Sequence, residues 1–344
     1  MEPYRELEVE IAEWAGYTPE QVVVCSSGTA ALHLALEAFQ LPLGSEVLVP
    51  SFTMVACARA VALAGLTPVF VDCDDRLLMN YMRVEEALEK DAEQRIRAMM
   101  PVHIYGRKCD VDCFPQVSDC RIVEDLAEAH GVNPHPETDA ACWSFFKNKI
   151  VAGEEGGAVA FREVRHAVLA RQLRSLGFTN AHDFDHVPRG HNYRLANLLA
   201  EPILQELRLW NLPLVVSETP DGWMCRTVMD QRRLIEHWYQ CECPTEWQMS
   251  PRDSPWVYDF RIPELSCEKQ TEIVRALQAS GIPARHAFKP MHLLEEFKHC
   301  RVIGGGEAER ASREICYLPI SPGITTEEST RLAFDIVRKV VSKD

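Results

Sequence analysis

The chain of 344 residues is long enough for two domains, and its 47% hydrophobic and 25% charged residues are typical of a globular protein. This composition excludes a disordered chain, a fibrous repeat and a small disulfide-stapled fold. Lys and Arg total 36 against 51 Asp and Glu, and the formal net charge of −15 argues against nucleic-acid binding as the main task.

No stretch of about 18 apolar residues predicts a transmembrane helix. The start, MEPYRELEVEIAEWAG, is acidic and amphipathic, unlike a secretory signal. The 13 cysteines are scattered along the chain. Two groups lie close together but lack the spacing of a zinc site, namely Cys109, Cys113 and Cys120, and the pair Cys241 and Cys243. We therefore expect reduced thiols in a cytoplasmic protein. A metal at one of these groups is the alternative, and we predict no metal ligand.

The first two-thirds of the chain alternate short apolar runs with helical runs. Strand, crossover and strand with few alternating polar positions predict a mostly parallel α/β sheet covered on both faces. Ligands of such sheets bind outside the carboxyl ends of the strands. The predicted strands are 22–25, 45–52, 67–74, 96–106, 121–126, 142–146 and 157–161, and the predicted helices are 26–39, 54–65 and 84–94.

The pattern changes after about residue 205. A segment rich in Trp and Pro, 211–256, precedes a second α/β pattern. Thr325 or Thr326 is the expected N-cap of the closing helix. We expect a large domain over 1–205 and a smaller α+β domain over 206–344. The predicted strands of the second pattern are 257–262 and 313–321, and its predicted helices are 267–281 and 325–341.

The first candidate site is the segment SSGTA, residues 26–30, between a strand and a helix. Small residues and hydroxyls at a helix N-terminus form an anion site, because the free amides and the helix dipole favour a phosphate there. The alternative is a plain N-cap with a tight turn.

Two further candidates follow apolar strands. Asp125 stands at the carboxyl end of the strand 121–126, where α/β sheets keep functional groups, although an acid that caps the next turn would look the same. Lys147 and Lys149 follow the strand 142–146 and face a glycine-rich return, 153–157. A desolvated lysine there is suited to forming a Schiff base. Two solvated lysines are the alternative.

Together and in this order, these segments resemble the DegT/DnrJ/EryC1/StrS family of pyridoxal-phosphate (PLP) enzymes, which are chiefly nucleotide-sugar aminotransferases. The resemblance implies the PLP-dependent transferase fold of type I and a homodimer with shared active sites. It covers roughly residues 20–335. The matching segments are CSSGTAALHLAL, GSEVLVPSFTMVACARAVALAGLTPVFVDCD, MMPVHIYG, VEDLAEAHG, SFFKNKIVAGEEGGAVAF, GHNYRLANL, SGIPARHAFKPMH and YLPISPGITTEE.

The resemblance also implies roles for single residues. Lys149, not Lys147, matches the lysine that carries the cofactor and moves protons during catalysis. Asp125 matches the acid that pairs with the pyridine nitrogen and keeps it protonated. Glu128 occupies the position where many relatives have Gln or His near the ring. The remaining cofactor-binding positions are Gly28, Thr29 and Ser144 at the phosphate, and Asn192, which in the family reaches the phosphate of the neighbouring subunit.

The chain departs from the family at Met54, where an aromatic residue usually stacks on the PLP ring. The expected activity is the transfer of an amino group from an amino acid to a keto-sugar nucleotide. L-Glutamate is the expected amino donor. Other PLP chemistry (a decarboxylase, dehydratase or isomerase) and transamination of a non-sugar acceptor are alternatives. A non-catalytic PLP-binding protein is the third, although Lys149 and Asp125 are both present. We also considered His286, Lys289 and His292 as contacts for a substrate phosphate.

Overall fold

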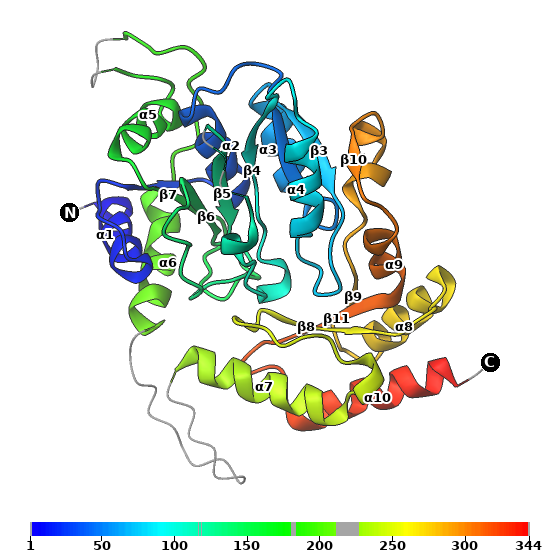
Figure 1. The fold of residues 1–344 in the computed structure, drawn as a ribbon. Helices are drawn as coiled ribbons and strands as arrows, with labels where there is room; N and C mark the ends of the chain where they lie inside the picture. Colours follow the sequence, from blue (N-terminus) through cyan, green and yellow to red (C-terminus); the bar gives the residue numbers. More distant parts are fainter. Residues whose placement is uncertain (1, 116, 118, 180–183, 211–226, 343–344) are drawn as a thin grey trace.

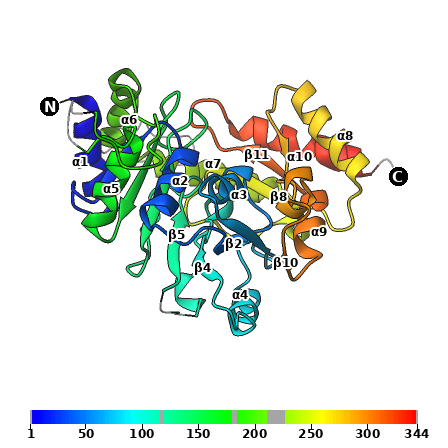
Figure 2. The ribbon, with the colours of Figure 1, turned by 90° about the horizontal axis from the view of Figure 1, so that it is seen from above.

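The computed structural model describes residues 2–342 except residues 116, 118, 180–183 and 211–226. Within these residues, an eight-stranded sheet has the order β1-β7-β6-β5-β4-β2-β3-β10, and helices lie along both of its faces (Figures 1 and 2). Its strands are β1 (Val22–Cys25), β2 (Glu46–Pro50), β3 (Thr67–Val71), β4 (Ile96–Met99), β5 (Arg121–Asp125), β6 (Ala140–Ser144), β7 (Gly157–Phe161) and β10 (Val302–Ile303).

The large sheet is mostly parallel, as the sequence predicts, and β7 is its antiparallel strand. The predicted strand over 96–106 is wrong beyond Met99, where β4 ends and a 3₁₀ turn follows at Ile104–Gly106. Tyr105 and Gly106 both have positive φ, 52° and 84°, and such residues cannot continue a strand. A Cβ at position 106 would lie 1.6 Å from the carbonyl oxygen of Ser254, so this close approach requires glycine.

Alternating side chains of the strands divide the large core into two layers. In β1, Val22 and Val24 pack with α1 and α6 on one face, whereas Val23 and Cys25 pack with α2 on the other. α2 also packs against α3 and α5. The helices of this part are α1 (Pro3–Ala15), α2 (Gly28–Ala38), α3 (Val55–Leu63), α4 (Tyr81–Glu89), α5 (Val164–Arg174) and α6 (Asn197–Trp210).

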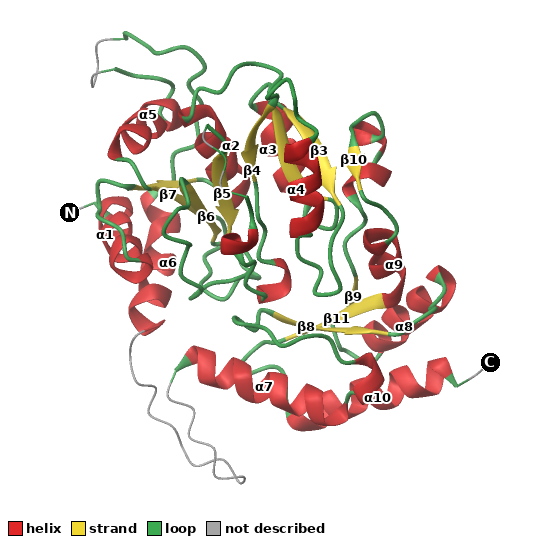
Figure 3. Cartoon of the chain, in the orientation of Figure 1, coloured by secondary structure: helices red, strands yellow, loops and turns green. Residues whose placement is uncertain are grey.

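The C-terminal part builds a second, antiparallel sheet in the order β8-β11-β9 (Figure 3). The predicted boundary between 205 and 206 falls within α6, and β10 returns to pair with β3 of the large sheet. We retain the two-domain division as a proposal. The elements of this part are α7 (Val228–Glu242), β8 (Val257–Arg261), α8 (Cys267–Ala279), β9 (Arg285–His286), α9 (Glu307–Glu314), β11 (Ile315–Pro319) and α10 (Glu327–Val341). Residues 211–226 of the predicted Trp- and Pro-rich segment lie outside the described residues.

Buried charges join the two parts of the molecule. Arg107, after the 3₁₀ turn, donates to both carboxylate oxygens of Asp259 in β8, at 3.0 and 2.9 Å. Arg252 also donates to Asp259, and it reaches Glu236 in α7 at 2.9 Å. Burial opposes ionisation of Asp259, but Arg107 and Arg252 together hold its pKa below the ordinary value. The network fixes β8 against the loop that follows β4.

No helix among the described residues has the length and apolar character needed to cross a bilayer. Every cysteine that the structure describes is a free thiol. Neither of the two cysteine groups in the sequence forms a disulfide in these described regions.

Candidate active site

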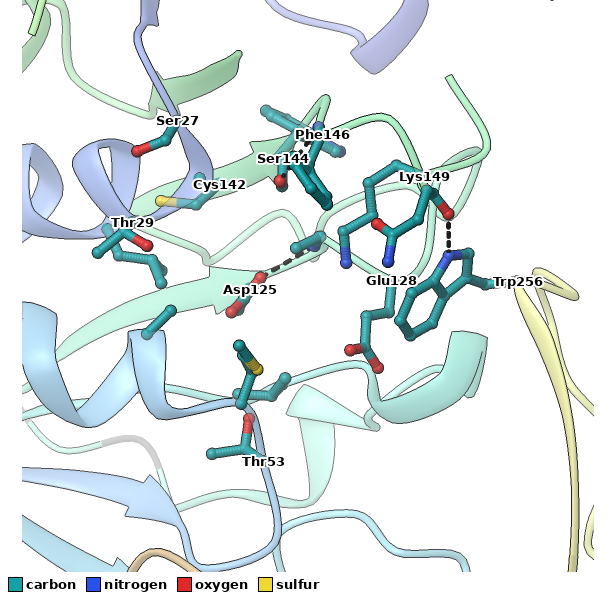
Figure 4. Close-up of a pocket in the computed structure, with 18 of the residues that line it drawn as sticks. Ser27, Thr29, Thr53, Asp125, Glu128, Cys142, Ser144, Phe146, Lys149 and Trp256 are labelled. Atoms are coloured by element: carbon teal, nitrogen blue, oxygen red, sulfur yellow. Dashed lines mark hydrogen bonds between the residues drawn. The ribbon is translucent and has the colours of Figure 1, made fainter. Parts of the chain in front are cut away.

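A cavity of about 380 Å³ opens at the carboxyl ends of β5 and β6, beside the N-terminus of α2 (Figure 4). The parallel strands β5 and β6 bring Asp125 and Ser144 to the same edge of the sheet, which is where the sequence predicts the ligand. Of the eight predicted site residues, the cavity gathers these seven: Gly28, Thr29, Met54, Asp125, Glu128, Ser144 and Lys149.

The N-terminus of α2 presents open amides to this cavity. Ser27 caps the helix by accepting a hydrogen bond from the amide of Ala30 at 3.1 Å. The amides of Gly28 and Thr29 belong to the first turn, whose N–H groups have no partner inside a helix. A Cβ at position 28 would lie 2.7 Å from the Cβ of Ser144, so glycine is needed for β6 to approach the helix. This cradle is suited to an anion.

Asp125 ends β5 with its carboxylate held from two sides. One oxygen accepts the amide hydrogen of Ala127 at 2.9 Å, and the other accepts the thiol hydrogen of Cys57 at 3.2 Å. Burial and the charge of Asp125 raise the pKa of Cys57 well above its ordinary value, so this thiol remains a donor. Cys57 is a positioning residue that sequence analysis missed, because a cysteine inside a buried helix has no distinguishing pattern.

Lys149 lies in the turn after β6, where its amide donates to the carbonyl of Phe146 at 2.8 Å. The indole N–H of Trp256 donates to the carbonyl of Asn148 at 2.7 Å and thereby fixes the ring beside this turn. The ammonium nitrogen of Lys149 lies 4.1 Å from the centroid of the Trp256 ring. The neighbouring Lys147 is exposed instead. The structure therefore brings Lys149, not Lys147, into the cavity.

Burial and neighbouring charges set the protonation of two facing groups. Burial lowers the pKa of Lys149, although Glu128 and Asp125 favour its charged form. Burial raises the pKa of Glu128 to about 7, although Lys149 and the amide of Tyr105 oppose this shift. That amide donates to Glu128 at 2.8 Å. A lysine with a lowered pKa is more readily the neutral amine, which is the nucleophilic form.

His130 holds the lysine-bearing turn through two hydrogen bonds of its ring. Its Nδ1 accepts the amide hydrogen of Val151 at 3.1 Å, so its Nε2–H donates to the carbonyl of Ser144 at 3.0 Å. Burial, with a smaller effect from Lys149, lowers the pKa of His130 to about 3, so the ring is neutral. His130 therefore ties together the two ends of the segment that carries Lys149.

The chain as a whole is similar to characterised aminotransferases. The model of the DegT/DnrJ/EryC1/StrS aminotransferase family matches residues 2–337. The chain belongs to this family. It is 31% identical over 335 residues to the GDP-perosamine synthase of Caulobacter vibrioides, covering 95% of this chain and 87% of that protein.

Two further proteins of similar sequence or structure are also aminotransferases. A dTDP-3-amino-3,4,6-trideoxy-alpha-D-glucose transaminase of Streptomyces venezuelae is 32% identical over 348 residues, covering 97% of this chain and 86% of the relative. The crystal structure of a DegT DnrJ EryC1 StrS aminotransferase from Brucella abortus has a TM-score of 0.83 and 26% identity, covering 99% and 91% of the two chains. This protein is therefore an aminotransferase of the family, with its fold.

The opposite wall of this aminotransferase cavity comes from the C-terminal part. Trp256, Arg285, Phe288 and Tyr317 line it. None of the four was among the residues predicted from the sequence, which placed the candidate phosphate contacts at His286, Lys289 and His292 instead. His286 bonds Thr271 at 3.3 Å instead, and it does not line the cavity.

Two predicted positions need separate comment. Met54 precedes α3 at the cavity mouth and is 51% exposed, so it leaves much of this side open. Asn192 is exposed and does not line the cavity of its own chain. Its backbone pairs with Ser175, at the end of α5. Its role at the neighbouring subunit remains a prediction.

Proposed function

We propose that this family member binds PLP and transfers an amino group from L-glutamate to a keto-sugar nucleotide. One observation carries the proposal: Lys149, the carboxylate of Asp125 and the open N-terminus of α2 face the same cavity. PLP requires an amine, an acid for its ring nitrogen and a cradle for its phosphate. The cradle is supported by the close approach of Gly28 to Ser144, which leaves no room for a Cβ at position 28.

The residues divide the cofactor among them. The amides of Gly28 and Thr29 and the hydroxyl of Ser144 would hold the phosphate, and Met54 would cover part of the ring. Asp125 would pair with the pyridine nitrogen, because a nearby carboxylate favours its protonated form. When bound, PLP supplies a carbonyl that condenses with amines and a ring that takes up electrons.

Lys149 is proposed to do the acid–base work. In the neutral form that burial favours, its Nζ would accept the proton from the substrate carbon and return it at the cofactor carbon. The Trp256 ring, held by its bond to Asn148, restricts where this Nζ can lie. Glu128 faces the same amine and, with a pKa of about 7, can itself hold a proton near neutral pH.

The acceptor class is supported by the names of the relatives and by the second wall. The two curated relatives are a GDP-perosamine synthase and a dTDP-amino-sugar transaminase, which are enzymes of sugar nucleotides. Arg285 places a positive charge in the lining of the cavity, where an anionic acceptor would reach it. We therefore propose that Arg285 binds the acceptor.

Two half-reactions, followed separately by absorbance, test this proposal. L-Glutamate added to the PLP-loaded enzyme should convert the near-visible cofactor band to that of the aminated cofactor, and 2-oxoglutarate should be released. A panel of keto-sugar nucleotides should then restore the original band. If glutamate and other common amino donors leave the band unchanged, the enzyme performs other PLP chemistry. If only non-sugar ketones restore it, the acceptor class is wrong.

We also propose a cytoplasmic homodimer with shared active sites. The free thiols of the described residues support a reducing compartment, and the exposed Asn192 is available to a second copy. Mixing Lys149→Ala with Asn192→Ala chains should regenerate activity, because some dimers would have one site with neither lesion. An active monomer in analytical ultracentrifugation would contradict the shared site.

A further inference from the structure

Three side chains converge outside the cavity, between α2 and the segment that follows α5. His33 and Glu37 lie one turn apart on α2, and His191 is 154 residues from Glu37 in the chain. One ligand atom from each of the three lies within 4.8 Å of the others. His33 is only 2% exposed. The cluster thus joins one buried histidine to two partly buried groups, Glu37 and His191, from segments far apart in the sequence.

Hydrogen bonding within the cluster leaves one nitrogen unsatisfied. The carboxylate of Glu37 lies 2.5 Å from Nε2 of His191. Its other oxygen is 3.7 Å from Nε2 of His33, which is too far for a hydrogen bond. That buried Nε2 makes no hydrogen bond of good geometry to the described residues. Burial lowers the pKa of His33, and the nearby backbone carbonyl of Leu63 only partly opposes this shift. Buried polar atoms normally make a full hydrogen bond, so Nε2 has the capacity to bind a ligand.

The other nitrogen of His33 explains how the ring is oriented. Its Nδ1 lies 3.1 Å from the hydroxyl of Tyr193, which accepts when Nδ1 carries the hydrogen. The lone pair of Nε2 then faces Glu37 and His191. A ring that donates through one nitrogen and presents the other to a site is the usual arrangement of a metal-binding histidine. The Tyr193 ring in turn stacks on His191, with centroids 4.8 Å apart.

We infer that His33, Glu37 and His191 bind Zn²⁺. Two imidazole nitrogens and one carboxylate oxygen are a donor set that Zn²⁺ takes, with a water molecule in the fourth position. Tetrahedral ligands at about 2.0–2.2 Å from the ion lie roughly 3.3 Å from one another. The carboxylate of Glu37 lies 2.5 Å from His191 through one oxygen and 3.7 Å from His33 through the other, and the ligand atoms of all three residues lie within 4.8 Å of one another. Binding would therefore draw the two histidines toward one oxygen of Glu37 by side-chain movements of about 1 Å. The inference does not depend on the proposed function.

The position of the cluster indicates what the ion does. The backbone of His191 is already bound to the end of α5, through Leu173 at 2.6 Å and Leu176 at 2.8 Å. α2, whose N-terminus forms the anion cradle, lies against α5 (Figure 1). Zn²⁺ would therefore fasten the cradle helix to the segment that carries Asn192, next to His191.

Zinc titration of the metal-stripped holoenzyme tests the site. After treatment with EDTA and gel filtration, the protein is titrated with Zn²⁺ in competition with a chelating dye, which reports the affinity. Bound zinc is then quantified by elemental mass spectrometry. We expect one equivalent of Zn²⁺ to bind per chain, and we expect this binding to require the three residues of the cluster. His33→Gln, Glu37→Gln and His191→Gln should each weaken it at least about 100-fold. Tyr193→Phe, which removes only the outer hydrogen bond, should weaken it about 10-fold.

Two controls keep the test decisive. His286→Gln removes a histidine outside the cluster and should leave zinc binding unchanged. Co²⁺ bound in place of Zn²⁺ reports the ligands in the unmutated protein, even if a variant fails to fold. Nitrogen and oxygen ligands should give weak visible bands without the strong thiolate band of a cysteine site. A thiolate band, or equal zinc affinity in the unmutated protein and the cluster variants, would overturn the inference.

Discussion

The two walls of the cavity differ in how the chain builds them. On one wall, Gly28, Asp125 and Lys149 each lie at or just beyond the end of an element of the large sheet. On the other wall, Trp256 and Arg285 come from the C-terminal part, more than a hundred residues later. We propose that the first wall has the groups for cofactor chemistry and that the second has those that meet an acceptor. On this proposal, the groups for the reaction follow local sequence signals, whereas the groups for the substrate are assembled by tertiary packing.

The largest effect is expected at the centre of the first wall. Lys149→Ala should lower turnover by about 10⁴-fold, because it removes both the cofactor attachment and the acid–base group. It should also abolish the near-visible band of the loaded enzyme. The exposed Lys147 gives the matched control, and Lys147→Ala should leave both the band and the turnover nearly unchanged. Equal losses in the two variants would remove the distinction between them.

Asp125→Asn should have the next largest effect, lowering turnover by about 10²-fold or more while PLP still binds. The amide keeps the size of the side chain but loses the charge that favours a protonated ring nitrogen. Cys57→Ala is the control, because it removes only the thiol that donates to Asp125, and it should cost a few-fold. Single-turnover absorbance with glutamate measures both. A rate near that of the unmutated enzyme would mean that the nitrogen has another partner.

The second wall should respond through binding. Arg285→Gln should raise KM for the acceptor about 10-fold with kcat nearly unchanged, because its contact with an anion is expected to be equal in the ground and transition states. Lys289→Gln changes a cation that follows strand β9 and does not line the cavity, and it should leave KM unchanged. Steady-state kinetics of the acceptor half-reaction distinguish the two. If Lys289→Gln raises KM more than Arg285→Gln does, the assignment of Arg285 to acceptor binding is wrong.

Glu128 lies between the walls, and its expected effect is the smallest. Folded Glu128 keeps its proton up to about pH 7, whereas the ordinary value is 4.5. The folded state therefore binds more protons than the unfolded state between these values, and this group's contribution to stability falls as pH rises through that window. Unfolding of cofactor-free protein by urea, compared with Glu128→Gln between pH 4.5 and 8, isolates this contribution. A pH-independent difference between the two proteins would contradict the raised pKa.

The large sheet and its ligand edge could be predicted because their signals are local. Apolar runs predict β1, β2, β3, β5, β6 and β7, and the candidate groups lie at the ends of these runs or in the residues that follow them. The strand predicted through residue 106 failed because Gly106 is needed where the chain passes the carbonyl of Ser254. That contact joins residues far apart in sequence, so no local pattern could indicate it.

The same reasoning explains which site residues were missed. Trp256 makes one hydrogen bond to the turn around Lys149, and the His130 side chain makes two to the ends of that segment. None of these bonds leaves a sequence signature. His33 looks like an ordinary residue of a buried helix until His191 is placed beside it. The sequence predicts no metal ligand, because its cysteines and histidines lack the close spacing of a zinc site, and the zinc cluster proposed here is assembled only by the fold.

The attachment point of the cofactor is the most direct test of the central claim. The PLP-loaded enzyme is reduced with borohydride, which fixes the cofactor to the lysine that holds it, and the digested peptides are mapped by mass spectrometry. We predict a single modified residue, Lys149, and loss of the modification when glutamate is added before reduction. Modification of Lys147, or of no lysine in this turn, would contradict the account.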